Sequence, residues 1–290
     1  TDTPQMFSRM VEEGAGGVFD GYCFTFAQGI ELDPLLPSES TRALARSDLP
    51  AFYIPRWLDK VPPAVADFAR RGFSTVIRLP MRNDAALDVV RTEMVGLAKA
   101  DAPMLLFLRR IGILAASIDG ERLKEDAFTL ELTRVEEPLA DKFGLTLVDL
   151  AANGRFLVAR GDIPEPYMRA AVADGLESGA LPQSWKGWKG AGEVALAVPI
   201  EEVSSGFYPR LYTFLPMGRG ATSPFRGHLH GSFFPSSSRT SLDSTVRVNS
   251  LVLEHAIKLA SGTAKWLQER NRKMHASGLP LETVIRSAVD

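Results

Sequence analysis

Arg239 is the residue of this sequence best placed to do chemistry. It lies within a run of small hydroxyl residues, Ser236-Ser237-Ser238-Arg239-Thr240-Ser241. A guanidinium presents several N–H donors in a rigid plane and can bind a phosphate through two parallel hydrogen bonds. The run separates a strand-like segment from a long helical one, so we expect Arg239 at a strand-to-helix corner, where it could reach a phosphate. A solvated loop arginine is the alternative interpretation.

Two histidines close to this run suggest other chemistry. His228 and His230 would point to one face of a strand, because alternate strand residues share a face, and they could be two metal ligands. No third ligand is evident in the sequence, so two ordinary strand histidines are the competing interpretation. Ser236–Ser238 near His230 would suit a serine hydrolase, but the G-x-S-x-G turn that exposes such a nucleophile is absent.

Two further motifs are weaker candidates for a functional site. The run Gly14-Ala15-Gly16-Gly17 could cradle a phosphate, yet it has neither a Walker lysine nor the context of a dinucleotide fingerprint, which favours a flexible loop. The repeat at residues 185–190, WKGWKG, predicts an exposed loop that could face a partner.

The composition is typical of a soluble globular protein. The chain has 290 residues, of which 45% are hydrophobic and 23% charged, enough for one large or two ordinary domains. The net charge of −2 favours neither nucleic acid nor an anionic membrane as a partner. The single cysteine, Cys23, excludes an intrachain disulfide framework and suits the reducing cytoplasm. No apolar run approaches the roughly 20 residues that span a bilayer.

Residues 1–82 predict strands and loops around short helices. Segment 21–26 alternates like a half-buried strand, and segment 72–80 predicts a strand that ends at a proline. Residues 65–71 predict a short helix. The proline-rich stretch 31–63 is typical of loops.

A connector follows, at residues 83–103. Asn83 or Asp84 can cap a helix that runs to about residue 100, and its apolar residues recur at helical spacing on one face. We therefore place the domain boundary here, with a second domain at 104–270. Residues 271–290 would form a tail or the start of a further helical segment.

The second domain predicts a series of strands followed by a strand-loop-strand-helix unit. Asp119-Gly120 predicts a hairpin turn between strands at 111–118 and 128–133, and Pro166 lies in the first turn of a predicted helix. This order indicates a mixed α+β domain. The remaining predicted elements are a strand-like apolar run at 104–108, strands at 145–150, 156–160, 194–200, 211–215 and 229–234, and a helix at 249–259.

Three separated stretches together resemble one family. The sequence TDTPQMFS at residues 1–8 is similar to the segment that follows the glycine-rich ATP lid of sacsin-type proteins. The sequence GFSTVIRLPMR at residues 72–82 resembles the closing strand of that ATP-binding domain, where a threonine lies beside the adenine. Residues 211–260 resemble the end of the first subdomain of the middle domain in the ninety-kilodalton heat-shock chaperones, where a Ser-Arg pair precedes a long helix.

This resemblance, which covers roughly residues 1–265, implies an ATPase of the GHKL superfamily of gyrase, heat-shock chaperone, histidine kinase and MutL proteins. The fold we expect is α+β: a remnant of an α/β-sandwich ATP-binding domain at 1–82, then a split β-α-β transducer domain of the ribosomal-protein type. The resemblance places Thr75 near the adenine and makes Arg239, with Ser238 beside it, the group that meets the γ-phosphate. The implied cofactors are ATP and Mg²⁺.

The sequence departs from the family because the asparagine helix that holds Mg²⁺, the D-x-G adenine motif and the glycine lid are not found in it. We therefore expect these 290 residues to be part of a longer ATP-driven, chaperone-like switch in which residues before Thr1 carry those motifs. A protein client is the expected partner, and a homodimer is a second candidate. The alternatives are a non-catalytic protein-interaction scaffold of the same fold and a metal or serine hydrolase.

Overall fold

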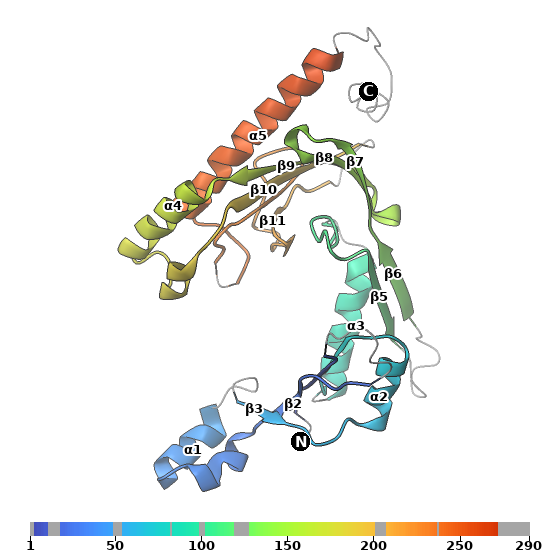
Figure 1. Ribbon diagram of the computed structural model, residues 1–290, viewed down its shortest axis with the longest axis vertical. Coiled ribbons are helices and arrows are strands. Elements are labelled where there is room, and N and C mark those ends of the chain that lie inside the picture. The colour runs from blue at the N-terminus through green and yellow to red at the C-terminus, as the bar shows by residue number, and fades with distance from the viewer. Residues whose placement is uncertain are drawn as a thin grey trace. The chain divides into compact units, whose positions relative to one another are not determined.

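The computed structural model describes residues 3–10, 18–48, 54–81, 83–98, 102–118, 128–200, 207–236 and 238–271. The chain divides into two compact units, Thr1–Val90 and Arg91–Asp290, and each is described by itself below. Both units combine strands and helices, so the chain is a mixed α+β protein (Figure 1).

The first unit is built on a four-stranded antiparallel sheet with the order β3-β2-β1-β4. One face of this sheet packs against helix α2, where Phe7 and Cys23 meet Val65 and Ala69 in a small core. The bounds of the elements are β1 Gln5–Ser8, β2 Cys23–Phe26, η1 Gly29–Leu35, α1 Glu39–Asp48, β3 Pro55–Trp57, α2 Pro63–Arg70, β4 Thr75–Arg78 and α3 Asp84–Ala98.

The structure corrects the expectation that residues 31–63 form only loops. Helix α1 and the short helix η1 occupy much of that stretch. Helix α1 starts just after Ser38, whose Oγ accepts a hydrogen bond from the backbone N–H of Thr41 at 3.2 Å. Prolines lie on either side of α1 but not within it, so they bracket the helix and do not break it.

Helix α3 begins where the sequence predicts. The side chain of Asn83 accepts a hydrogen bond from the backbone N–H of Ala86 at 2.9 Å, which satisfies one of the free donors of the first turn. The division between the two units, after Val90, falls within this helix.

The second unit is built on a seven-stranded sheet with the order β12-β11-β13-β10-β9-β8-β7. All neighbouring strands are antiparallel except β11 and β13, which are parallel. The bounds are β5 Ile113–Ile118, β6 Phe128–Thr133, β7 Val135–Ala140, η3 Lys142–Gly144, β8 Leu145–Asp149, η4 Ala151–Asn153, β9 Arg155–Ile163, α4 Glu165–Glu177, η5 Gln183–Gly187, β10 Gly192–Pro199, β11 Leu211–Thr213, β12 Leu215–Pro216, β13 His228–Gly231 and α5 Arg247–Asn271.

Helices α4 and α5 cover one face of this sheet (Figure 1). The larger core lies between these helices and the sheet, where Leu157, Ala159 and Val194 from the strands meet Val172 of α4 and Val252 of α5. The small size of Gly231 is required here, because a Cβ on it would lie 2.4 Å from a methyl carbon of Val252.

A second core lies on the opposite face of the sheet. There Val148, Val158 and Ala195 pack against Leu105 and Leu106. The structure corrects the expectation of a strand at 104–108, since that run forms turns. Buried turns explain the apolar run, because burial requires apolar side chains whatever the backbone conformation.

The predicted hairpin at 111–133 is present as a two-stranded antiparallel sheet of β5 and β6, in which Ile118 pairs with Phe128. The predicted turn at Asp119-Gly120 lies outside the described residues. Among the helices that the structure describes, none is both long and apolar enough to cross a membrane.

Candidate functional site

Arg239 lies in the loop between β13 and α5, with its backbone fixed by two hydrogen bonds. Its N–H donates to the carbonyl of Ser236 at 2.8 Å, and its carbonyl accepts from the N–H of Gly218 at 2.8 Å. Its φ of 55° is in the left-handed region, which costs roughly 1–2 kcal/mol for a residue with a side chain. Two backbone hydrogen bonds, one within its own loop and one to the loop after β12, therefore hold this arginine in a conformation that it does not prefer.

The side chain of Arg239 is exposed but anchored at one end. Its Nη2 donates to the carbonyl of Thr213 at 3.1 Å and also to the Thr213 hydroxyl. Thr213 is the last residue of β11. The guanidinium thus has a defined direction, which a freely solvated loop arginine lacks.

The neighbouring hydroxyl groups bond to one another. Ser238 Oγ lies 2.8 Å from Thr240 Oγ1 and 3.3 Å from Ser236 Oγ, and Ser236 Oγ accepts from the N–H of Ser241 at 3.3 Å. Ser237 is outside the described residues. The structure therefore places Ser238 and Arg239 in one exposed hydroxyl-rich turn.

A glycine-containing loop lies directly against this turn. A Cβ on Gly220 would lie 2.8 Å from the carbonyl oxygen of Thr240, and one on Gly218 would lie 2.9 Å from the Thr240 methyl group. Only glycine lets the two loops approach so closely. This packing supports the Arg239 turn from the side of β12.

Asn249 ties the same turn to the long helix. Its side chain, fully buried, accepts from the N–H of Phe234 at 2.8 Å and donates to the carbonyls of Phe234 at 2.9 Å and Asp243 at 2.8 Å. One amide on the first turns of α5 therefore fixes both ends of the loop that carries Arg239. The sequence analysis did not single out this residue, although a polar residue on the buried face of a predicted helix is a recognisable signal.

Thr75 is the first residue of β4 in the other unit, where it pairs with Ser8 of β1 and is exposed. Arg239 and Ser238 belong to the second unit. The structure thus brings Ser238 and Arg239 together in the second unit, while Thr75 belongs to the first unit.

The two histidines are buried in the centre of the sheet of the second unit. His228 Nδ1 accepts from the N–H of Arg210 at 3.1 Å, and His230 Nδ1 accepts from the N–H of Phe214 at 3.2 Å. His230 Nδ1 also lies 3.3 Å from the carbonyl oxygen of Tyr212, and its Nε2 lies 3.8 Å from a carboxylate oxygen of Glu193. Within the described ranges, no three His, Cys, Asp or Glu side chains are grouped to hold a metal.

The structure also shows a pocket that the sequence analysis missed. Its volume is about 620 Å³, and we call it the Arg109 pocket. It lies on the face of the sheet away from α4 and α5, beside the buried turns that follow residue 104. Its lining residues are Phe107, Leu108, Arg109, Arg110, Ile111, Glu136, Glu193 and Phe214.

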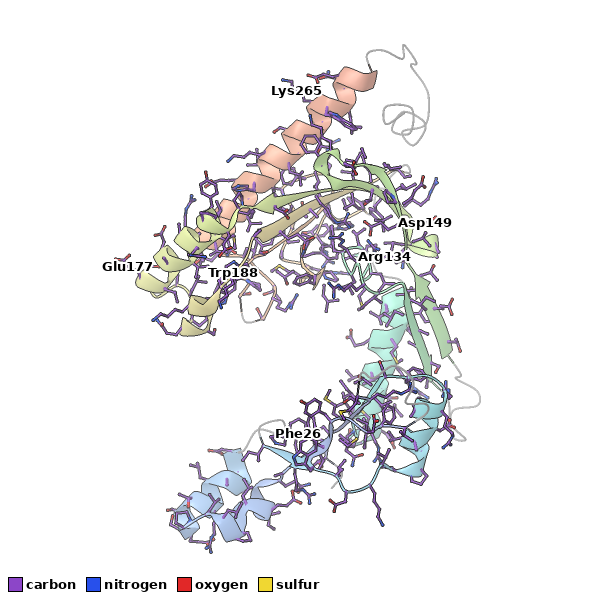
Figure 2. All side chains as sticks on the ribbon, in the orientation of Figure 1. Phe26, Arg134, Asp149, Glu177, Trp188 and Lys265 are labelled. Carbon is purple, nitrogen blue, oxygen red and sulfur yellow. The ribbon has the colours of Figure 1, made fainter. Side chains whose placement is uncertain are left out.

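Both carboxylates of the Arg109 pocket have buried basic side chains as neighbours. Glu136 pairs with Arg134 and, at 3.1 Å, with Arg160; Arg160 also donates to Thr146 Oγ1 at 2.9 Å. The Arg134 side chain is only 4% exposed, and it lies on the face of the sheet opposite α5 (Figure 2). Glu193 has His230 as its buried neighbour.

These contacts favour the charged forms of the two carboxyls. The nearby imidazole of His230 lowers the pKa of Glu193 more than burial raises it. For Glu136, burial is the largest influence and raises the pKa, but Arg134 and Arg160 together bring the pKa below its ordinary value. Both glutamates are therefore carboxylates at neutral pH.

The residues of the Arg109 pocket carry no sequence signal that identifies them. Arg160 and Glu193 lie at ends of predicted strands, where a charged residue is ordinarily solvated. Only the register shows that Arg160 stands opposite Ala195, which in turn stands opposite His230. The pairing of strands far apart in the chain determines this neighbourhood, and periodicity within one strand does not reveal it.

The tryptophan repeat belongs partly to the core. Trp185 and Trp188 stack with ring centroids 5.3 Å apart, and Trp185 meets Phe234 edge-on at 5.4 Å. Trp185 lies on the short helix η5 and not in an extended loop. Both indoles pack against the larger core. The prediction of an exposed loop is therefore confirmed for Lys186 and Lys189 and wrong for the two tryptophans.

The sequence matches no protein-family model, no curated protein and no solved structure at a significant level.

Proposed function

We propose that this chain is the distal part of an ATP-driven conformational switch of the GHKL type, in which Arg239 senses the γ-phosphate. The observation that carries the proposal is the conformation of Arg239. It has a left-handed backbone, an exposed guanidinium and an anchor on Thr213. Strained residues held in place by their surroundings cluster at functional sites.

The architecture of the second unit supports the same proposal. Three antiparallel strands, β7, β8 and β9, lead into α4, and β10 precedes the strands that lead to α5. Helices cover one face of this sheet. A two-layer α/β unit that ends in a long helix suits a split β-α-β transducer domain, with Arg239 just before that helix.

In the proposed mechanism, Arg239 neutralises the negative charge that develops on the γ-phosphate during hydrolysis, and the Ser238 hydroxyl donates a further hydrogen bond. An arginine in this role contributes a factor of about 10³–10⁵ in rate. Thr75 would lie at the adenine end of the nucleotide in the first unit. Approach of the second unit would then couple hydrolysis to domain motion.

Among the described residues, no three His, Cys, Asp or Glu side chains are grouped so that they could hold a metal ion by themselves. We therefore assign no step of the mechanism to the metal in this chain. The resemblance places its ligands, and the glutamate that orients water, in residues before Thr1.

The test is an Arg239→Ala substitution in the full-length protein, with ATP turnover and ATP affinity measured together. We expect turnover to fall at least about 100-fold, because charge neutralisation in the transition state is lost, while affinity changes little. Arg226→Ala is the control, since Arg226 is another exposed arginine of the same unit. Equal turnover in the two variants would remove Arg239 from the mechanism.

A further inference from the structure

We propose that the Arg109 pocket binds a small organic dianion: a compact aromatic or aliphatic group that carries a phosphate or two carboxylates. This site is separate from the turn that carries Arg239, and the proposal does not depend on ATP hydrolysis. Four features of the structure support it.

The first feature is the size and lining of the pocket. A volume of about 620 Å³ lies within the roughly 300–1,000 Å³ typical of small-molecule sites. The apolar part of the wall is formed by Phe107, Leu108, Ile111 and Phe214. Such a wall can cover the carbon skeleton of a ligand while the charged groups orient it.

The second feature is an excess of positive charge. Arg109 and Arg110 line the pocket and are exposed. Within the described part of the chain, neither guanidinium forms a hydrogen bond or an ion pair. The two glutamates in the wall already have Arg134, Arg160 and His230 as partners. Leaving His230 aside, Arg109 and Arg110 in the wall and Arg134 and Arg160 behind Glu136 stand against two glutamates, so the arginines exceed the carboxylates by two, which matches a dianion.

The third feature is a surplus of buried hydrogen-bond donors behind the wall. Arg134 Nε and Arg160 Nη2 are both buried and have no hydrogen-bond acceptor among the residues that the structure describes. Buried polar groups are normally paired, so each exception calls for an explanation. Donors in excess of acceptors favour a ligand rich in acceptor oxygens, which phosphate and carboxylate groups are.

The fourth feature is the conformation of Phe214 at the rim. This bulky residue has a φ of 68° and is 59% exposed. Its ring lies 5.0 Å from that of His230, which in turn stacks on Phe107 at 5.2 Å. A large aromatic residue with positive φ is a genuine outlier. Here it places an aromatic ring in the same pocket wall as Glu136 and Glu193.

A cation is a poorer match for the same pocket. Glu136 is already paired with Arg134 and Arg160, and Arg109 and Arg110 would repel a cation. Among the described residues that line the pocket, Glu136 and Glu193 are the only acidic ones. The balance of charge therefore selects an anion.

The test is calorimetric titration of the 290-residue chain with phenyl phosphate and with phthalate, without nucleotide or Mg²⁺. We expect at least one of these probes to bind with a Kd of about 1 mM or tighter, as suits a fragment-sized ligand. Binding of phenyl phosphate alone would identify the ligand group as phosphate, and binding of phthalate alone would identify it as dicarboxylate. Phenol, which lacks the charge, should not bind.

Arg109→Gln should weaken binding about tenfold or more, since a charge-assisted hydrogen bond is lost. This variant should fold, because the replaced side chain is exposed and makes no internal hydrogen bond; circular dichroism checks it. Arg226→Gln, outside the pocket, is the matched control and should bind as the unmodified chain does. Arg239→Ala should also bind normally, which separates this proposal from the ATPase proposal.

Two results would overturn the proposal. One is the absence of binding by both probes at about 10 mM, a concentration roughly tenfold above the expected Kd. The other is binding that weakens equally in Arg109→Gln and Arg226→Gln, since that pattern would report overall charge and not a site.

Discussion

At the scale of single residues, Arg239 combines an unfavourable backbone conformation with a side chain whose direction is fixed by a hydrogen bond to Thr213. Its backbone N–H and carbonyl are held by Ser236 and Gly218, and its guanidinium is held by Thr213. Each contact comes from a different part of the chain. The hydroxyl-rich run around Arg239 was visible in the sequence, but the left-handed φ was not, because no glycine marks that position.

The conformation of Arg239 gives a prediction about stability. Arg239→Gly should give a protein about 1 kcal/mol more stable to unfolding than Arg239→Ala, because glycine has no Cβ to strain at φ 55°. Both variants lose the same side-chain bonds, so chemical denaturation of the pair isolates the backbone effect.

Ser244 offers the matched control for this pair. It is exposed and is not among the described non-glycine residues with positive φ. There the order should reverse, with Ser244→Ala more stable than Ser244→Gly. If alanine were the more stable residue at position 239 as well, the strain at Arg239 would not exist in solution.

Glu136 gives a prediction about pH. Its pKa in the folded protein is lower than the ordinary value of 4.5, so the carboxylate stabilises the fold above pH 4.5 and this contribution is lost as the pH falls through the lowered pKa. The free energy of unfolding should therefore fall less steeply below pH 4.5 in Glu136→Gln than in the unmodified chain.

At neutral pH the same Glu136→Gln variant should be about 2 kcal/mol less stable, because the buried Arg134 and Arg160 lose their charged acceptor. Urea unfolding followed from pH 7 to pH 3 measures both effects. Parallel curves for the two proteins over the acid range would show that the pKa of Glu136 is not lowered.

At the scale of elements, the sequence predicted the long periodic segments well. Strands β8, β9 and β10 and helices α3, α4 and α5 are confirmed, because each has a continuous pattern and, for α3 and α4, a helix-start signal at Asn83 or Pro166. Helix α1 was missed because none of its residues is buried. Without a buried face it has no apolar stripe, and local capping alone marks it.

The Arg109 pocket could not be predicted for a related reason. Its wall joins the turns at 107–111 to β7, β10 and the residue after β11, and these segments become neighbours only when the sheet forms. Individual charged residues at strand ends are common. The sequence offers no means to distinguish Arg160, which is buried, from one that is solvated.

Asn249 links helix α5 to the loop between β13 and α5 that carries Arg239. Asn249→Leu removes three hydrogen bonds between α5 and the Arg239 loop. It takes away the side-chain partner of the Phe234 N–H and carbonyl, while the Asp243 carbonyl keeps the N–H of Val246 at 3.3 Å. We expect a loss of about 3 kcal/mol in unfolding free energy.

Asn249→Asp separates the contributions of that side chain. It keeps the acceptor for the N–H of Phe234 but loses both donors, so its loss should lie between that of the leucine variant and zero. Chemical denaturation of the two variants measures this order. A leucine variant as stable as the unmodified chain would mean that the amide does not hold the loop.

At the scale of the whole molecule, the chain consists of two units with separate cores. The proposed function assigns a different end of the nucleotide to each unit. Thr75 in the first unit would lie near the adenine, and Arg239 in the second would meet the γ-phosphate. The proposal therefore requires the two units to approach each other when ATP binds.

The distance between the two units in the full-length protein tests this requirement most directly. Spin labels on cysteines introduced at Ser74, beside Thr75, and at Ser244, beyond Arg239, would report it, with Cys23 replaced by alanine; both label positions are exposed. We predict that a non-hydrolysable ATP analogue shortens the distance relative to ADP. We also predict that Arg239→Ala abolishes this difference, and a distance distribution that is the same with ADP and with the analogue would contradict the account.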